Sequence, residues 1–162
     1  MTERIDLLVM GGGPAGYAAA IRASHLGKNV VIAERQRLGG TCLNRGCIPT
    51  KALLESAHFY AGLSSAGLHG VELEVKGLDY GQVIKNKDQI VQGLVKGLEF
   101  LLDKRRIRVL AGQARFLPSG EVQVGEDVFQ ADHVLVATGT EPLELPGLEA
   151  DGQVVVNSDQ LL

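Results

Sequence analysis

The chain has 162 residues, of which 45% are hydrophobic and 22% are charged, and its formal net charge is −3. This length suits one domain of ordinary size, and the composition excludes a disordered segment or a fibrous repeat. The near balance of charge argues against a nucleic-acid partner, and no apolar run reaches the ~18–20 residues that a membrane-spanning helix needs. Glycine, with 21 residues, is in excess.

The first elements along the chain predict a strand, a helix and a second strand. Residues 5–10 form a short run that is apolar except at Asp6, residues 17–26 are rich in alanine and other helix formers, and residues 30–33 are again apolar. Such a β-α-β unit requires a right-handed crossover and a parallel sheet covered by helices. The predicted fold class is therefore α/β.

Two further helices are predicted from apolar residues at helical spacing, over residues 51–61 and 79–105. Gly93 and Gly97 lie within the second helix. Two interpretations fit their spacing: close packing against a neighbouring element, or simple tolerance of glycine at a cost of ~1 kcal/mol each.

The rest of the chain predicts short strands and a linker. Alternating apolar residues separated by turn residues predict a small antiparallel β-meander, with strands at residues 107–110, 114–116, 122–124 and 128–131. Residues 133–137 predict a return to a buried, parallel-type strand. Residues 141–151, which contain two prolines, predict a linker.

A glycine motif lies between the first strand and the first helix. In the sequence Gly-Gly-Gly-Pro-Ala-Gly, Gly11 permits the tight turn, Gly13 lets backbone N–H groups approach a pyrophosphate, and Gly16 lets helix and sheet pack closely. Glu34 ends the second strand, where a carboxylate can accept hydrogen bonds from both ribose hydroxyls. This conjunction predicts a dinucleotide site, and a glycine turn without a ligand is the weaker alternative. Both NAD and the ADP half of FAD fit the motif, whereas Glu34 disfavours NADP.

The two cysteines, Cys42 and Cys47, are five residues apart. In a regular helix their Cα atoms would be about 8–9 Å apart, beyond the ~7 Å limit for a disulfide. Pairing therefore requires an irregular loop, which the intervening and flanking residues Gly39, Gly40, Asn44 and Gly46 permit. Two buried thiols without a bond and an incomplete zinc site are the alternatives.

The residues that follow the second cysteine favour a reactive thiol. Pro49 suits the first turn of the next helix, which places Cys47 near a helix N-terminus, where the helix dipole stabilises a thiolate. Lys51 lies one helical turn further on, where its charge can support an electron-rich group in contact with the sulfur.

Taken together, these motifs resemble a known enzyme family. The glycine loop, Glu34, the segment GGTCLNRGCIPTK at residues 39–51 and the segment VATGTEP at residues 136–142 resemble the flavin-dependent pyridine nucleotide–disulfide oxidoreductases. Within that family they are most similar to the dihydrolipoyl (lipoamide) dehydrogenase branch. The resemblance covers the whole chain in order.

The resemblance implies a Rossmann-like FAD-binding domain with FAD as the cofactor. Glu34 would hold the adenosine ribose, Lys51 would lie beside the flavin N5, and the backbone of Ala114 would meet the adenine. The full set of cofactor-binding residues that it implies is Gly11, Gly13, Pro14, Ala15, Gly16, Glu34, Arg35, Gly40, Thr41, Cys42, Lys51, Ala114, Thr138, Gly139 and Thr140. No metal site is expected.

The same resemblance implies a redox disulfide as the catalytic group. Cys47 would be the thiolate next to the flavin, and Cys42 the interchange thiol that exchanges with the substrate. The implied reaction converts dihydrolipoamide and NAD+ into lipoamide and NADH. A glutathione- or mercuric-reductase activity is the alternative within the family, and a non-enzymatic dinucleotide-binding redox module is the alternative outside it.

The resemblance also implies how the chain relates to a longer enzyme. Residues 1–150 correspond to an N-terminal, incomplete portion of the FAD-binding domain, and residues 151–162 to the start of the connection to an NAD-binding domain. The family's His–Glu base pair has no counterpart, since the last histidine is His133. We therefore expect a truncated chain that is not catalytically complete alone.

The expected partners follow from the same resemblance. They are the lipoyl groups of a 2-oxo acid dehydrogenase or glycine cleavage complex, and a second copy in the homodimer of the full-length enzyme. No nucleic acid and no membrane are expected, and the expected location is cytoplasmic.

Overall fold

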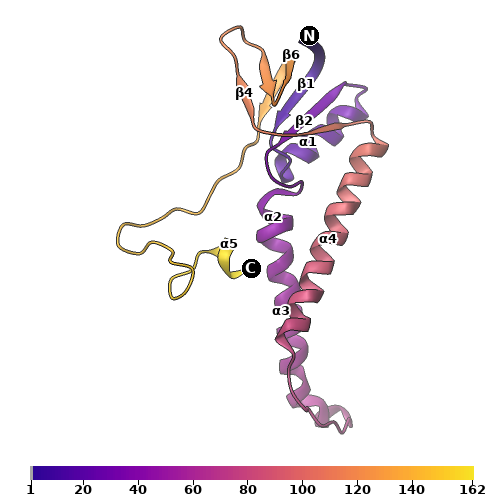
Figure 1. The fold of residues 1–162 in the computed structure, drawn as a ribbon. Coiled ribbons are helices and arrows are strands. Elements are labelled where there is room, and N and C mark those ends of the chain that lie inside the picture. The colour runs from indigo at the N-terminus through magenta and orange to yellow at the C-terminus, as the bar shows by residue number, and fades with distance from the viewer. Residues whose placement is uncertain (1) are drawn as a thin grey trace.

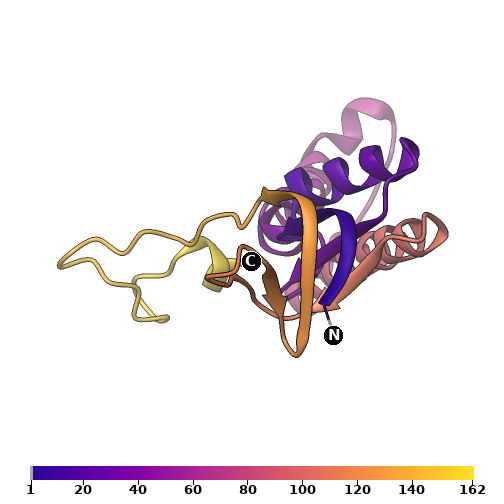
Figure 2. The same cartoon turned by 90° about the horizontal axis from the view of Figure 1, so that it is seen from above.

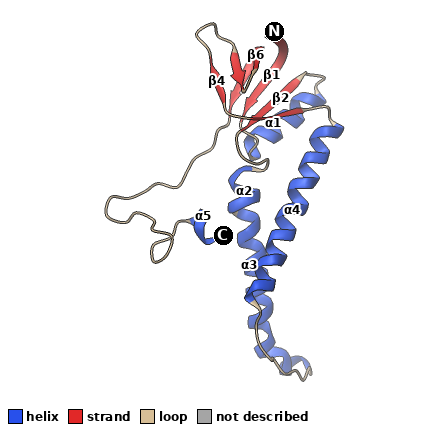
Figure 3. Cartoon of the chain, in the orientation of Figure 1, coloured by secondary structure: helices blue, strands red, loops and turns tan. Residues whose placement is uncertain are grey.

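The computed structural model describes residues 2–162, which fold around one six-stranded sheet (Figure 3). The strand order is β3-β2-β1-β6-β5-β4. The strands are β1 (Thr2–Met10), β2 (Val30–Glu34), β3 (Arg108–Ala111), β4 (Ala114–Phe116), β5 (Val122–Val124) and β6 (Asp127–Val136). The helices are α1 (Pro14–His25), α2 (Gly40–Arg45), α3 (Cys47–Gly62), the 3-10 helix η1 (Leu63–His69), α4 (Tyr80–Lys104) and α5 (Ser158–Leu161).

Strand β1 lies at the centre of the parallel part of the sheet, between β2 and β6. Its residue Leu8 is in register with Val31 of β2 and Val134 of β6. Alternate side chains of β1 point to opposite faces. Leu8 therefore packs with the meander strands on one face, whereas Val9 packs with α1 and α4 on the other. These two buried layers confirm the predicted α/β class.

The predicted grouping of the short strands is wrong in two places. Residues 107–110 were expected in the antiparallel meander, but β3 pairs with β2 in parallel at the edge of the main sheet. The long helix α4 returns the chain to the start of β2, and a strand that begins there must run parallel to it. The strands predicted at 128–131 and 133–137 form the single strand β6, which is antiparallel to β5 and parallel to β1.

Helices α3 and α4 form a long antiparallel hairpin that projects from the sheet (Figure 1). Helix α4 begins where Asp79 accepts a hydrogen bond from the Gln82 amide at 3.1 Å. Its buried side includes Val91 and Val95, and its last turns reach the sheet through Leu98 and Leu102. Of the two interpretations of Gly93 and Gly97, close packing is wrong, because a Cβ on either would meet no atom within 4 Å.

Replacing either α4 glycine by alanine should therefore stabilise the chain. Gly93→Ala and Gly97→Ala are each expected to raise the free energy of unfolding by about 0.5–1 kcal/mol, because alanine lowers the backbone entropy lost on forming a helix. Urea denaturation followed by circular dichroism measures the change. A loss of stability in either variant would show that a neighbour packs against that position.

After β6 the chain runs out away from the sheet (Figure 2), and its last residues come back beside helices α2 and α4. Residues 137–157 form no helix or strand, in agreement with the predicted linker at 141–151. Helix α5 then lies near α2, where Asp159 pairs with Arg45. No helix among residues 2–162 combines the length and the apolar character needed to cross a membrane.

Candidate dinucleotide and redox-disulfide site

The glycine loop follows the carboxyl end of β1, as the sequence predicts. Gly11 has φ +111°, and a Cβ there would overlap the carbonyl oxygen of Ala137 at the end of β6. A Cβ on Gly16 would overlap the carbonyl oxygen of Gly11. Both glycines are therefore required by packing inside the chain itself.

Gly13 differs from these two glycines. A Cβ on Gly13 would come no closer than 3.7 Å to any other atom, namely Cα of Gly40, which is an ordinary contact. Gly13 is the N-cap of α1, and no side chain caps the first turn of that helix. The orphan N–H groups and the dipole of a helix N-terminus favour an anion. This open, uncapped turn fits the pyrophosphate of a dinucleotide.

The Glu34 carboxylate joins the glycine loop to the end of β2. The Gly12 amide donates to Oε2 at 2.7 Å, and the Gln36 amide donates to Oε1 at 2.7 Å. Each carboxylate oxygen has a further lone pair that can accept from a ribose hydroxyl. The carboxylate is therefore held in place before any ligand binds.

These two hydrogen bonds predict a structural cost for losing the charge. Glu34→Gln is expected to lower the free energy of unfolding by about 1–2 kcal/mol, because an amide offers one acceptor oxygen and no charge. Glu55→Gln, at an exposed position on α3, is the matched control and should change stability by less than ~0.5 kcal/mol. Equal urea midpoints for the two variants would contradict the role assigned to Glu34.

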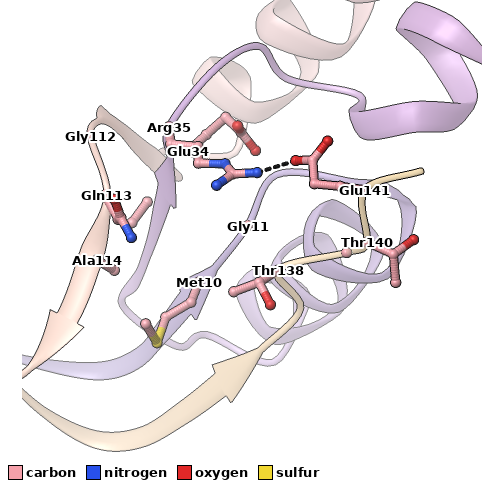
Figure 4. Close-up of a pocket in the computed structure, with 12 residues that line it drawn as sticks. Met10, Gly11, Glu34, Arg35, Gly112, Gln113, Ala114, Thr138, Thr140 and Glu141 are labelled. Carbon is pink, nitrogen blue, oxygen red and sulfur yellow. Dashed lines mark hydrogen bonds and ion pairs between the residues drawn. The ribbon is translucent and has the colours of Figure 1, made fainter. Parts of the chain in front are cut away.

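Two adjoining cavities run from the sheet to the cysteines. The first, of about 410 Å³, is lined by the ends of β1 and β2, by residues 138–141 after β6, and by Gly112, Gln113 and Ala114 (Figure 4). The second, of about 540 Å³, extends past the glycine loop to Cys42 and Cys47. Both cavities are lined in part by Gly11, Glu34 and Thr138. The arrangement has the extended form that a dinucleotide requires.

The two cysteines form a disulfide with a Cα–Cα distance of 4.6 Å. No unpaired cysteine is present among residues 2–162, so both alternatives, separate thiols and a zinc site, are wrong. The expected irregular loop is only partly observed, because Cys42 lies within the short helix α2. The break is confined to Gly46, where a Cβ would come within 2.9 Å of the Thr41 carbonyl oxygen. Cys47 begins α3, which confirms its predicted place at a helix N-terminus.

Asn44 fixes the turn that leads into α2. Its Nδ2 donates to the carbonyl oxygens of Leu38 at 2.9 Å and Gly40 at 3.0 Å. Its Oδ1 is buried and has no hydrogen-bond partner among the described residues. Asn44 lines the cavity beside the cysteines, so this acceptor suits a hydroxyl or N–H donor of a bound ligand.

Most of the predicted site residues lie together along these cavities. The predicted residues that line them are Gly11, Gly13, Pro14, Ala15, Glu34, Arg35, Gly40, Thr41, Cys42, Cys47, Ala114, Thr138, Gly139 and Thr140. Gly16 lies behind them, packed on Gly11. Lys51 is exposed on α3 and lines neither cavity, so its place beside a flavin stays a prediction.

Several lining residues were not predicted. Among those with polar side chains are Gln113, Asn44, Arg45 and Glu141. Glu141 bridges Arg35 and Arg45 across the cavity wall, as Figure 4 shows for Arg35. The position of Arg45 between the two cysteines could have indicated that it lines the cavity. The spacing of the motifs does not indicate this for Glu141.

A glycine loop with an open N-cap, a carboxylate at the end of β2 and a disulfide in the adjoining cavity define a class of proteins that combines a Rossmann-type glycine loop with a redox disulfide. Residues 5–162 match the family described as pyridine nucleotide-disulphide oxidoreductase. The chain belongs to this family.

The relatives agree with this assignment. The chain is 42% identical over 164 residues to a dihydrolipoyl dehydrogenase of Bacillus subtilis, covering 98% of this chain and 36% of that protein. It is also 42% identical to a leghemoglobin reductase of Vigna unguiculata, with 97% and 31% coverage. The crystal structure of LpdA from Mycobacterium tuberculosis has the same fold, with a TM-score of 0.83 over 99% of this chain and 37% of that chain, at 24% identity. The chain thus spans about a third of the length of these relatives.

Proposed function

We propose that this chain provides the FAD-binding and disulfide part of a dihydrolipoyl dehydrogenase reaction, which converts dihydrolipoamide and NAD+ into lipoamide and NADH. The observation that carries the proposal is that the Cys42–Cys47 disulfide lines the cavity that also holds the glycine loop and Glu34. FAD, when bound, supplies a two-electron acceptor for the reduced cysteine pair.

The chain's own residues provide separate anchors for the parts of FAD. The first-turn N–H groups of α1 would bind the pyrophosphate, and Glu34 would accept from the adenosine ribose. Gln113 and Ala114 would border the adenine at the far end of the first cavity. The flavin would then lie toward Cys47, where we propose Lys51 as its neighbour.

The proposed chemistry of the disulfide is thiol exchange. A substrate thiolate attacks Sγ of Cys42, the Cys42–Cys47 bond breaks, and its electron pair goes to Cys47. The second substrate thiol then displaces Cys42, so that the substrate becomes a cyclic disulfide. The protein is left with a Cys42 thiol and a Cys47 thiolate, and one proton goes to solvent. The start of α3 at Cys47 supports this direction, because a helix N-terminus stabilises the thiolate.

Substrate choice is tested on the reduced chain. The pair is reduced, separated from excess reductant and mixed with lipoamide, glutathione disulfide or Hg(II), and the remaining dithiol is trapped by alkylation. We expect lipoamide to reoxidise the pair at least about tenfold faster than glutathione disulfide. Faster oxidation by glutathione disulfide, or formation of the disulfide by Hg(II) with release of elemental mercury and two protons, would assign a different activity within the family.

The proposed partners are lipoyl groups of a 2-oxo acid dehydrogenase or glycine cleavage complex, together with a second copy of the same protein in a homodimer. The likeness to dihydrolipoyl dehydrogenase supports the first. Large exposed apolar side chains on the α3–α4 hairpin, such as Phe59 and Leu94, support the second. The cytoplasmic location stays a prediction.

A further inference from the structure

Arg45 is the charged residue between the two cysteines, and the proposed chemistry does not use it. It ends α2 and lines the cavity with both Cys42 and Cys47. Its side chain is only 28% exposed, and its Nη1 lies 2.6 Å from Oδ2 of Asp159. Its Nη2 lies 3.6 Å from Oε2 of Glu141. The residue between the two cysteines thus carries a guanidinium that two carboxylates hold, and it lines the same cavity as the disulfide.

The partner Asp159 is itself well positioned. Its side chain is 23% exposed, and it belongs to α5, far along the chain from α2. The side chain of Asn157 caps α5 by accepting from the amides of Asp159 and Gln160, each at 3.1 Å. The buried Lys87 of α4 binds the carbonyl oxygen of Leu162 and fixes the other end of the helix. The carboxylate is therefore anchored from both sides.

The charges of this cluster balance only while the cysteines are oxidised. Arg35 and Arg45 pair with Glu141 and Asp159, which makes two positive and two negative charges. The other charged residues that line the cavity of the uncharged disulfide are Glu34 and Arg37, whose charges also cancel. Reduction adds a thiolate to the same cavity. A nearby cation stabilises a thiolate and has no comparable effect on a disulfide. A nearby carboxylate destabilises the thiolate and likewise leaves the disulfide almost unaffected.

We propose that Arg45 tunes the redox equilibrium of the Cys42–Cys47 pair toward the reduced form, and that Asp159 limits this effect by neutralising the guanidinium. Arg45 acts through its charge and does not take part in bond making. The inference rests on the proposed function only in taking the pair to cycle between disulfide and dithiol.

The equilibrium can be measured on the 162-residue chain without a cofactor, in a glutathione buffer near pH ~8.5, the ordinary thiol pKa. Two glutathione thiols lose two electrons and become glutathione disulfide. The Cys42–Cys47 bond breaks and takes up those electrons as one thiol and one thiolate, and one proton goes to solvent. Alkylation followed by mass spectrometry gives the ratio of disulfide to dithiol.

Three variants separate an electrostatic role from a structural one. Arg45→Gln is expected to raise the disulfide-to-dithiol ratio about threefold, and Asp159→Asn to lower it about threefold, because the first removes the cation and the second removes its counter-charge. Arg45→Lys keeps the charge and should stay within about 1.5-fold of the parent chain. Thermal unfolding of each variant checks that it is folded.

Arg45→Gln and Asp159→Asn break the same ion pair, so a purely structural role of that pair would shift the disulfide-to-dithiol ratio in the same direction in both variants. Shifts of the ratio in opposite directions therefore indicate an electrostatic role. Shifts in the same direction, or equal ratios in all chains, would overturn the inference while leaving the proposed function intact. A pair that neither glutathione nor dithiothreitol reduces would overturn the proposed function, and the inference with it.

Discussion

Replacing either cysteine by serine is expected to slow the reduction of bound FAD by dihydrolipoamide by roughly 1000-fold or more. Cys42→Ser removes the sulfur that we assign to substrate exchange, and Cys47→Ser removes the sulfur that we assign to the flavin side. Neither variant can form the Cys42–Cys47 bond, so no two-electron relay remains. Anaerobic mixing, followed by the loss of visible flavin absorbance, measures the rate.

Two controls accompany this prediction: the stability of the serine variants and the direct reduction of flavin by dithionite. Loss of this short disulfide loop costs each variant about 2 kcal/mol of unfolding free energy, and the cost should be the same for Cys42→Ser, Cys47→Ser and the double variant. Dithionite reduces flavin directly and should act equally on all of the chains. A single-serine variant that keeps more than about a tenth of the parent rate would show that dihydrolipoamide reaches the flavin without the pair.

The second large effect is expected at Gly13. Gly13→Ala should weaken FAD binding about 30-fold, or about 2 kcal/mol, because the added methyl group occupies the place where the pyrophosphate approaches α1. Folding should be nearly unaffected, since the nearest atom to that Cβ is 3.7 Å away. Isothermal titration with FAD, alongside urea denaturation, separates binding from stability.

Two other glycines serve as matched controls for Gly13. Gly62→Ala adds a methyl group at the end of α3, where no atom lies within 4 Å, and should leave FAD affinity unchanged. Gly16→Ala places its methyl group against the Gly11 carbonyl oxygen, so it should cost more than ~2 kcal/mol of stability. Unchanged FAD affinity in Gly13→Ala would exclude the glycine loop as the pyrophosphate site.

The parts of the site that could be predicted from the sequence are those whose spacing is local. Within the first 47 residues lie the glycine loop, Glu34 and the cysteine pair. Their residue types and local spacing indicate the backbone geometry and the chemistry directly. The long helix α4 was predicted to within one residue at each end, because Asp79 marks its start and its apolar side is continuous.

The remaining features depend on contacts that spacing does not encode. The pairing of β3 with β2 is decided by where α4 returns the chain, and a four-residue strand carries too little alternation to show its direction. Helix α2 begins at the second of two adjacent glycines, Gly39 and Gly40, which favour a loop in the sequence. Arg45, Glu141 and Asp159 come from distant segments, and only the folded chain brings their charges together.

Titration of the 162-residue chain with FAD, FMN and NAD+ shows whether the cavity that joins the glycine loop to the disulfide binds FAD. We expect a Kd for FAD at or below about 1 μM. FMN should bind at least about 100-fold more weakly, because it lacks the adenosine half that Glu34 and the α1 N-terminus would hold. NAD+ binding tighter than FAD, or FMN binding as tightly as FAD, would contradict this expectation.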